Sequence, residues 1–235
     1  MITIKDTYVD KDGNNYNIRN INLTDMYNIG TYITETKRET GGFWSDDDNL
    51  ENGVYIFKTN YDPNKALRIY KDNQLYKYVY HNDVKYISKL TELQKNIKLT
   101  EFPTGIVTRE NYVIGQEIPF YENYETLYSQ LNNIKDKEKL FYFYKKIIDI
   151  LEELINNGIL YKDLHAKNFM IKGESIKLID FEDTSFSFSD NKKLLIENLR
   201  LLINYINNYL KIDYKVNSET LDGLKEEITV KSKRL

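Results

Sequence analysis

The chain has 235 residues, and its 33 Lys and Arg side chains nearly balance 36 Asp and Glu side chains. This balance gives no electrostatic reason to expect nucleic acid or an anionic membrane as a partner. The sequence contains no Cys, which excludes disulfides, thiolate metal sites and Cys nucleophiles. No apolar run approaches the length of a membrane span or a signal peptide, so we expect a soluble, cytoplasmic protein that does not contact membrane.

Residues 1 to about 70 are predicted to form strands separated by turns. Short apolar stretches, such as residues 54–57, alternate with turn-forming segments at residues 12–14, 41–42 and 62–64. This pattern favours an antiparallel sheet.

From about residue 73 the apolar spacing becomes that of a helix. The predicted helix face carries one carboxylate, Asp83, among the apolar residues Leu75, Val79, Ile87 and Leu90. Extended segments are predicted to follow at residues 105–107 and 112–114.

The second half of the chain is predicted to be mainly helical. A long apolar stripe begins after Asp136, a good N-cap residue, and ends before Gly158, a good residue for the end of a helix. Two short strands, near residues 169–171 and 176–179, flank a turn and form a small hairpin. Further helices are predicted after Asp190 and at about residues 218–230.

The stretch from residue 158 to residue 186 carries the residues suited to chemistry. It displays Asp163, Asn168 and Asp180 on loops around the predicted hairpin. Their carboxylate and amide oxygens suit Mg²⁺, which is usually bound by one or two carboxylates while substrate phosphates supply further oxygens. Phosphoryl transfer needs such a site, because its catalysis is mainly positioning and neutralisation of negative charge.

Here the sequence resembles the protein-kinase-like superfamily, whose catalytic loop reads H-R-D-L-x-x-x-N and whose metal loop reads D-F-G. Asp163 and Asn168 have the required spacing, and Asp180-Phe181 matches the metal loop. The resemblance implies that Asp163 orients or deprotonates the acceptor hydroxyl and that Asn168 and Asp180 bind Mg²⁺. His165 stands where protein kinases usually carry Lys, which looks more like the aminoglycoside phosphotransferases. The alternative is an ordinary turn followed by a strand end.

The resemblance extends upstream to residues 65–70, which match the strand V-A-I-K with Arg68 in the Lys position. Asp83 takes the place of the Glu that would pair with this cation, so we expect an Arg68–Asp83 ion pair. The alternatives are a solvated Arg68 and a helix-capping Asp83. Residues 112–118 resemble the strand that leads to the adenine site, or form a simple surface strand. The resemblance thus assigns nucleotide binding to Arg68, Gly53, Ala66, Gln116, Glu117, Ile118, His165 and Lys167.

The sequence also departs from the family pattern. No G-x-G-x-x-G precedes the candidate nucleotide strand, and Glu182 replaces the Gly of D-F-G. Few residues follow Asp180, which leaves no space for a full activation segment and the helices that bind peptide substrates in signalling kinases.

The resemblance therefore implies an α+β, two-lobed kinase-like fold, with a β-rich N-lobe at residues 1–116 and a minimal helical C-lobe at residues 117–235. ATP and Mg²⁺ are the implied cofactors. The expected function is an atypical kinase that transfers the γ-phosphoryl group of ATP to a hydroxyl acceptor, with Ser or Thr of a protein as the first choice. A small-molecule kinase and a pseudokinase that binds nucleotide or a partner without turnover are the alternatives.

Overall fold

The computed structural model describes residues 2–24, 30–37, 53–70, 76–110, 112–134, 136–181, 184–186 and 191–232. The chain divides into two compact units. Unit one comprises Met1–Lys95 and Phe102–Glu122, and unit two comprises Asn96–Glu101 and Asn123–Leu235. The expected lobe boundary between residues 116 and 117 stays a prediction.

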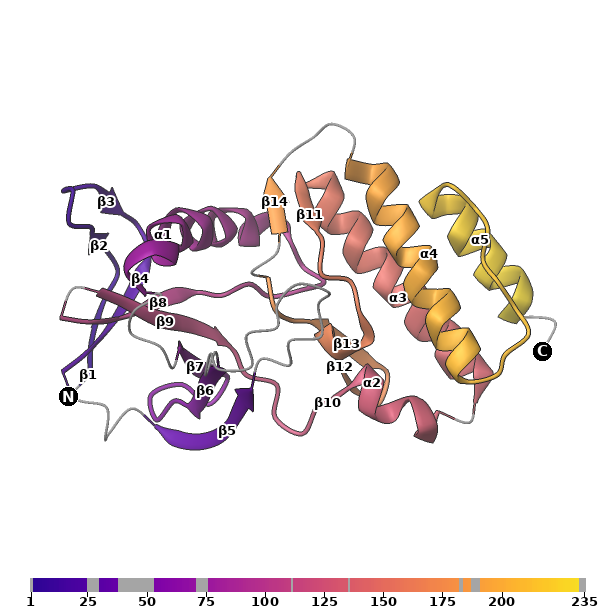
Figure 1. Ribbon diagram of the computed structural model, residues 1–235, viewed down its shortest axis with the longest axis horizontal. Helices are drawn as coiled ribbons and strands as arrows, with labels where there is room; N and C mark the ends of the chain where they lie inside the picture. Colours follow the sequence, from indigo (N-terminus) through magenta and orange to yellow (C-terminus); the bar gives the residue numbers. More distant parts are fainter. Residues whose placement is uncertain are drawn as a thin grey trace, which may run out of the picture. The chain divides into compact units, whose positions relative to one another are not determined.

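Unit one is built on a seven-stranded sheet with the order β1-β4-β8-β9-β7-β6-β5 (Figure 1). The pair β4–β8 is parallel, whereas the other described pairs of this sheet are antiparallel. The antiparallel sheet expected for residues 1–70 is therefore a mixed sheet, because β4 pairs with a strand far along the chain. The strands are β1 (Ile2–Lys5), β4 (Arg19–Leu23), β5 (Thr31–Lys37), β6 (Gly53–Lys58), β7 (Lys65–Tyr70), β8 (Gly105–Arg109) and β9 (Tyr112–Pro119).

A short hairpin joins β1 to β4 and forms around the predicted turn at residues 12–14. Its strands are β2 (Tyr8–Val9) and β3 (Asn15–Tyr16). The Asp10 carboxylate accepts hydrogen bonds from the backbone N–H groups of Asp12 and Asn14 at 2.9 and 2.8 Å. Gly13 adopts φ 84°, a left-handed conformation that suits glycine, so the turn prediction is confirmed.

The helix predicted after residue 73 is α1 (Tyr76–Leu93), which lies against one face of the sheet (Figure 1). Val84 and Ile87 pack with Ile106 of β8 and Val113 of β9 in one buried cluster. A second buried cluster contains apolar side chains from four strands of the sheet, namely Ile21, Leu23, Leu67, Ile69, Val107 and Ile114. Burial of such side chains is the main favourable term in folding, and it fixes the register of the central strands.

Unit two contains three long helices that lie side by side, α3 (Lys137–Asn156), α4 (Asn191–Tyr209) and α5 (Leu221–Ser232) (Figure 1). The predicted N-cap Asp136 accepts a hydrogen bond from the backbone N–H of Glu138 at 2.8 Å. The buried hydroxyl of Tyr144 on α3 donates a hydrogen bond to the side-chain oxygen of Asn207 on α4 at 2.8 Å. The helices predicted in this half are confirmed.

Short strands of unit two frame the loops that carry the predicted chemistry. The predicted hairpin is β12 (Phe169–Lys172) and β13 (Ser175–Leu178), joined through Gly173 at φ 63°. On its other edge, β12 pairs with β10 (Glu125–Thr126), which precedes α2 (Leu127–Gln130). A separate pair joins β11 (Ile159–Tyr161) to β14 (Thr184–Phe186). The 3₁₀ turns are η1 (Gln94–Asn96), η2 (Leu131–Asn133) and η3 (Ala166–Asn168).

A segment from the middle of the sequence, Asn96–Glu101, also belongs to unit two. The carboxylate of Glu153 on α3 accepts hydrogen bonds from the backbone N–H groups of Lys98 and Leu99 at 2.9 and 2.8 Å. The buried hydroxyl of Thr100 donates to the carbonyl of Leu178 at 3.3 Å. Helix α3 and the backbone at Leu178 therefore hold this segment in unit two.

The described residues form a mixed fold with a multi-stranded sheet in the first part of the chain and several helices in the second, which is compatible with an α+β class. Within the ranges that the structure describes, none of the helices combines the length and the apolar character that crossing a bilayer requires.

Candidate active site

The loop that carries Asp163 is positioned by the end of α3. Gly158 adopts φ 76°, which lets the chain turn directly from α3 into β11. After β11, the backbone N–H of Leu164 bonds to the carbonyl of Lys162 at 3.0 Å, and the N–H of Asn168 bonds to the carbonyl of His165 at 3.1 Å. These short turns fix the path of the loop between β11 and β12.

Within this loop, Asp163, His165 and Asn168 form one hydrogen-bonded group. The Asn168 amide nitrogen donates to the carboxylate Oδ2 and to the backbone carbonyl of Asp163, both at 2.9 Å. His165 Nε2 lies 3.3 Å from the same Oδ2. Asn168 is only 5% exposed, whereas the side chains of Asp163 and His165 are 40% and 45% exposed. A buried amide therefore orients a carboxylate that solvent and a ligand can reach.

The electrostatics of this group favour an ionised Asp163 beside a protonated His165. The hydrogen bond with His165, and then that with Asn168, lower the pKa of Asp163 below its ordinary value, although partial burial acts in the opposite direction. The hydrogen bond to Asp163 raises the pKa of His165, the Asp180 charge adds to this rise, and burial and Lys167 oppose it. His165 Nδ1 is buried and has no hydrogen-bond partner among the described residues. A buried polar atom of this kind needs a hydrogen-bond partner, which water, an ion or a ligand can supply.

The position of Asp180 is fixed by contacts of its two neighbours in the chain, Ile179 and Phe181. The backbone N–H of Ile179 donates to the carbonyl of Asn168 at 2.9 Å, and the Tyr161 hydroxyl donates to the carbonyl of Ile179 at 2.8 Å. The buried ring of Phe181 makes an edge contact with Tyr161, with ring centroids 5.6 Å apart. Asp180 itself adopts φ 60°, which is uncommon for a residue with a side chain and is found where the surrounding structure enforces it.

Two residues of this group, Asn168 and Asp180, carry the amide and carboxylate oxygens that Mg²⁺ commonly binds in proteins. None of the hydrogen bonds that the structure describes for the Asn168 side chain uses its amide oxygen, so this atom and the Asp180 carboxylate are the candidate ligands. The described residues contain no group of three or more His, Asp or Glu side chains placed to hold a metal ion. Glu182 and Asp183, adjacent acids in the sequence, lie outside the described residues.

The nucleotide residues predicted in unit one lie on neighbouring strands. Arg68 of β7 is paired with Gln116 of β9, and Ala66 is paired with Ile118, so these four residues share one face of the sheet. The Arg68 guanidinium lies 5.8 Å from the centroid of the Tyr70 ring, and the Gln116 amide donates to the Tyr70 hydroxyl at 2.9 Å. Gly53 is the first residue of β6.

One predicted contact cannot be followed in the structure. The side chain of Asp83, on α1, lies outside the described residues, so the Arg68–Asp83 ion pair stays a prediction. Within unit two, Asp163, His165 and Asn168 contact one another, and the charge of Asp180 acts on His165.

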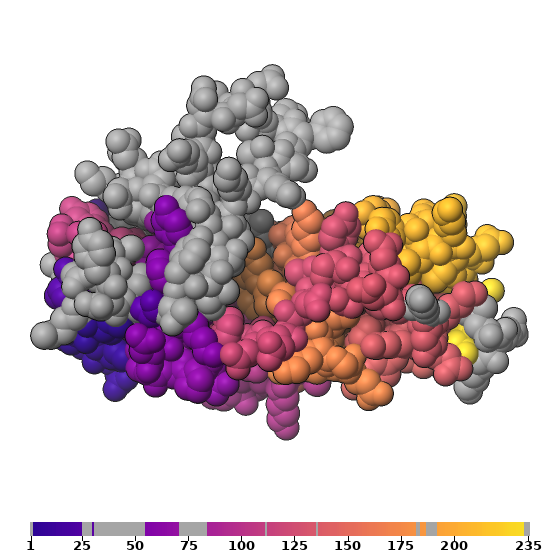
Figure 2. All heavy atoms as spheres, turned by 90° about the horizontal axis from the view of Figure 1, so that it is seen from below, coloured from indigo at the N-terminus to yellow at the C-terminus, as the bar shows by residue number. Residues whose placement is uncertain are grey.

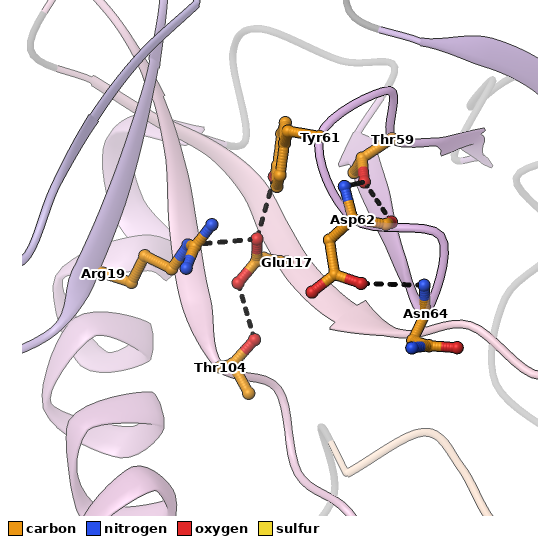
Figure 3. A network of polar contacts seen from close by, with 7 residues as sticks. All are labelled: Arg19, Thr59, Tyr61, Asp62, Asn64, Thr104 and Glu117. Carbon is orange, nitrogen blue, oxygen red and sulfur yellow. Dashed lines mark hydrogen bonds and ion pairs between the residues drawn. The ribbon is translucent and has the colours of Figure 1, made fainter.

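Glu117 is the centre of a buried polar network that the sequence did not indicate (Figure 3). Its side chain is buried and accepts hydrogen bonds from the hydroxyls of Tyr61 and Thr104 at 2.8 and 2.7 Å. Arg19 Nε of β4 lies 3.3 Å from the same carboxylate. The partners of Glu117 thus come from β4, the β6–β7 turn and the segment before β8, and they satisfy a buried charge that would otherwise be costly.

The β6–β7 turn is shaped to present Tyr61 to this network (Figure 3). The Thr59 hydroxyl donates to the Asp62 carbonyl at 2.6 Å, and the Asp62 carboxylate accepts from the backbone N–H of Asn64 at 2.9 Å. Burial and the nearby Glu117 charge raise the pKa of the Tyr61 hydroxyl, which therefore stays a proton donor. The backbone carbonyl of Glu117 also accepts a hydrogen bond from Thr104 N–H at 2.9 Å. The assignment of Glu117 to the adenine site stays a prediction.

The only signal for this network in the sequence is a Glu in an otherwise uncharged strand, Tyr112–Pro119. A buried carboxylate needs donors, but the sequence does not say which distant residues supply them.

Neither a scan against protein-family models nor a search of curated proteins finds a match to this chain.

Proposed function

We propose that this chain is an atypical kinase with a two-lobed, kinase-like fold, a β-rich N-lobe and a minimal helical C-lobe, which transfers the γ-phosphoryl group of ATP to a hydroxyl of Ser or Thr in a protein. The observation that carries the proposal is the hydrogen-bonded group of Asp163, His165 and Asn168, together with Asp180 in a left-handed backbone conformation. These residues come from two separate loops, yet they meet beside one hairpin.

Asp163 is proposed to accept a hydrogen bond from the acceptor hydroxyl and to orient its oxygen toward the transferred group. Its lowered pKa makes it a weak base, which is compatible with this role because the transition state of phosphoryl transfer is loose and demands little early proton removal. The fixed Asn168 amide keeps one carboxylate oxygen occupied and limits rotation of the side chain.

His165 is proposed to contact the transferred phosphoryl group. With its pKa raised by Asp163, the ring carries a proton on each nitrogen over more of the neutral range, and Nδ1 is then a buried donor that needs an acceptor. A phosphate oxygen is a suitable acceptor, since a charge-assisted hydrogen bond to it is strong.

Asn168 and Asp180 are proposed to hold Mg²⁺ through the amide oxygen and the carboxylate. When bound, the ion neutralises negative charge on the phosphate oxygens. Nucleotide binding is proposed for Ala66, Arg68, Gln116 and Ile118 on the shared face of β7 and β9, with Gly53 of β6 as a further assignment.

Transfer of labelled phosphate from ATP tests the proposal. Asp163→Ala and Asp180→Ala are each expected to lower transfer at least about 100-fold, and removal of Mg²⁺ is expected to abolish it. Asp222→Ala, an exposed acid in the first turn of α5, is the matched control and is expected to retain transfer.

Two alternatives predict other results. The presence of Arg68 where a Lys would contact phosphate favours a pseudokinase, because the fork of a guanidinium is not equivalent to an ammonium. If wild type and both variants transfer equally little while all bind nucleotide, the chain is a binding module. If hydroxylated small molecules are phosphorylated and proteins are not, the chain is a small-molecule kinase.

A further inference from the structure

Helix α4 carries an exposed apolar row in addition to its buried face. Leu201, Tyr205 and Tyr209 follow one another at steps of four, so they lie on one side of the helix. They are 62%, 52% and 41% exposed. The adjoining side of α4 carries the residues that pack into unit two, which include Leu195, Leu199, Leu202, Ile203 and Ile206.

This row continues to the candidate catalytic loop. The Tyr209 ring lies 6.4 Å, between centroids, from the ring of Tyr128 on α2, which is 40% exposed. The Lys167 ammonium lies 5.6 Å from the centroid of the Tyr128 ring. Lys167 stands between His165 and Asn168 in the chain, so the row ends at the residues proposed to carry out transfer. Figure 2 views the molecule from the side on which α2 lies, and the rose-coloured segment that includes α2 is at the surface.

We name Leu201, Tyr205, Tyr209, Tyr128 and Lys167 the aromatic row. Single exposed apolar residues are common, but a contiguous apolar surface usually marks an interaction site. Tyr is enriched in such sites because it supplies a large contact area and a polar tip.

The length of the aromatic row favours a polypeptide as its occupant. Leu201 to Tyr209 alone spans about 12 Å along the helix axis, at about 1.5 Å per residue. An extended peptide advances about 3.3 Å per residue, so a segment of several residues matches the row together with the loop.

The charge at the loop end of the row indicates which peptide fits. Lys162 and Lys167 are both exposed and flank Asp163 and His165 in the sequence. We infer that the aromatic row docks a peptide segment of the acceptor protein, with acidic side chains next to the acceptor hydroxyl and apolar or aromatic side chains farther along. This inference rests on the proposed function, since it assigns the protein acceptor to that same site.

Binding measured without ATP tests the inference separately from catalysis. The probes are fluorescein-labelled peptides GSEEELGFLGFG, GSKKKLGFLGFG and GSEEESGSSGSG, followed by fluorescence anisotropy with the full chain. The first peptide is expected to bind at least about tenfold more tightly than the other two. Leu201→Ser and Tyr205→Ser are expected to weaken its binding by about tenfold, and Lys167→Glu by a similar factor, with binding weakened progressively by salt.

The control variant is Tyr112→Ser, whose side chain is 54% exposed on β9, and it is expected to bind the first peptide as wild type does. Thermal unfolding of each variant shows whether it folds. Equal affinity for the three peptides, absence of binding, or unchanged binding by Leu201→Ser and Tyr205→Ser overturns the inference. A dimer that dissociates on Leu201→Ser also overturns it, because the row is then a self-interface. Peptide binding without phosphate transfer supports the docking surface and contradicts the proposed kinase.

Discussion

The hydroxyl of Tyr161 donates a hydrogen bond of 2.8 Å to the backbone carbonyl of Ile179, the residue that precedes Asp180. This bond links the strand before the catalytic loop to the segment that presents the proposed metal ligand. Tyr161 lies two residues before Asp163, where the pattern H-R-D-L-x-x-x-N has its His, and its ring packs against Phe181. The structure gives it a polar contact as well.

Replacing Tyr161 by Phe is therefore expected to separate these two contributions. The Phe ring keeps the edge contact with Phe181 but leaves the Ile179 carbonyl without this donor. We expect a loss of about 1 kcal/mol in the free energy of unfolding by urea, together with weaker phosphate transfer. Tyr112→Phe, on an exposed side chain, is the control; equal stability of the two variants contradicts the role of the Tyr161 hydroxyl.

Contact between His165 and Asp163 is expected to make stability depend on pH. The raised pKa of His165 means that its contribution is complete below pH 6.5 and is lost as pH rises through the folded-state pKa. The lowered pKa of Asp163 means that its contribution is complete above pH 3.8 and is lost as pH falls through its folded-state pKa.

The stability difference between wild type and His165→Gln should thus be larger at pH 5.5 than at pH 8.5. Both side chains are partly exposed, so we expect the difference at pH 5.5 to stay below about 1 kcal/mol. Urea unfolding at the two pH values measures it. A difference that does not change with pH shows that the two side chains do not form an ion pair in solution.

The left-handed conformation of Asp180 is expected to determine which substitutions the protein tolerates there. Gly adopts a positive φ without strain and Asn does so readily, whereas Ala does not. Asp180→Gly should therefore be about 1 kcal/mol more stable than Asp180→Ala, with Asp180→Asn between them. All three should lose phosphate transfer, because none retains the carboxylate. Equal thermal stability of Asp180→Gly and Asp180→Ala contradicts the conformation.

The buried network around Glu117 is expected to be important for stability. Glu117→Ala leaves the Tyr61 and Thr104 hydroxyls without their acceptor and Arg19 without its counter-ion, so we expect a loss of about 2–4 kcal/mol in chemical denaturation. Glu122→Ala is the matched control, because this carboxylate also pairs with a cation, Lys58, but is 63% exposed. Its expected loss is below about 1 kcal/mol. Similar losses for the two variants exclude a structural role of the network.

Local patterns in the sequence predict the three long helices of unit two and the hairpin well, whereas the short helix α2 was not predicted. Helix α3 begins after Asp136 because this carboxylate caps the first turn, and the β12–β13 turn forms at Gly173 because Gly accepts a positive φ. Helix α1 is also predicted, because its apolar residues recur at the spacing of one helix face. In the structure, Val84 and Ile87 of this helix are buried.

Contacts between distant segments could not be predicted in this way. The parallel pairing of β4 with β8 joins Arg19 to Gly105, and the Glu117 network depends on that pairing. Within the candidate site, the spacing of Asp163 and Asn168 indicates a shared role, but the φ of Asp180, the Tyr161–Ile179 bond and the buried Nδ1 of His165 depend on the folded backbone. Non-local contacts carry no local sequence signature.

The assignment of residues 96–101 to unit two has a consequence for dissecting this protein into fragments. A single cut near residue 122 would separate Glu153 from the backbone N–H groups of Lys98 and Leu99 that it binds. Expression of the C-terminal fragment alone would leave the Glu153 carboxylate on α3 without these two hydrogen bonds. A fragment that retains these bonds would need the six-residue segment joined to it by circular permutation, or supplied as a separate peptide.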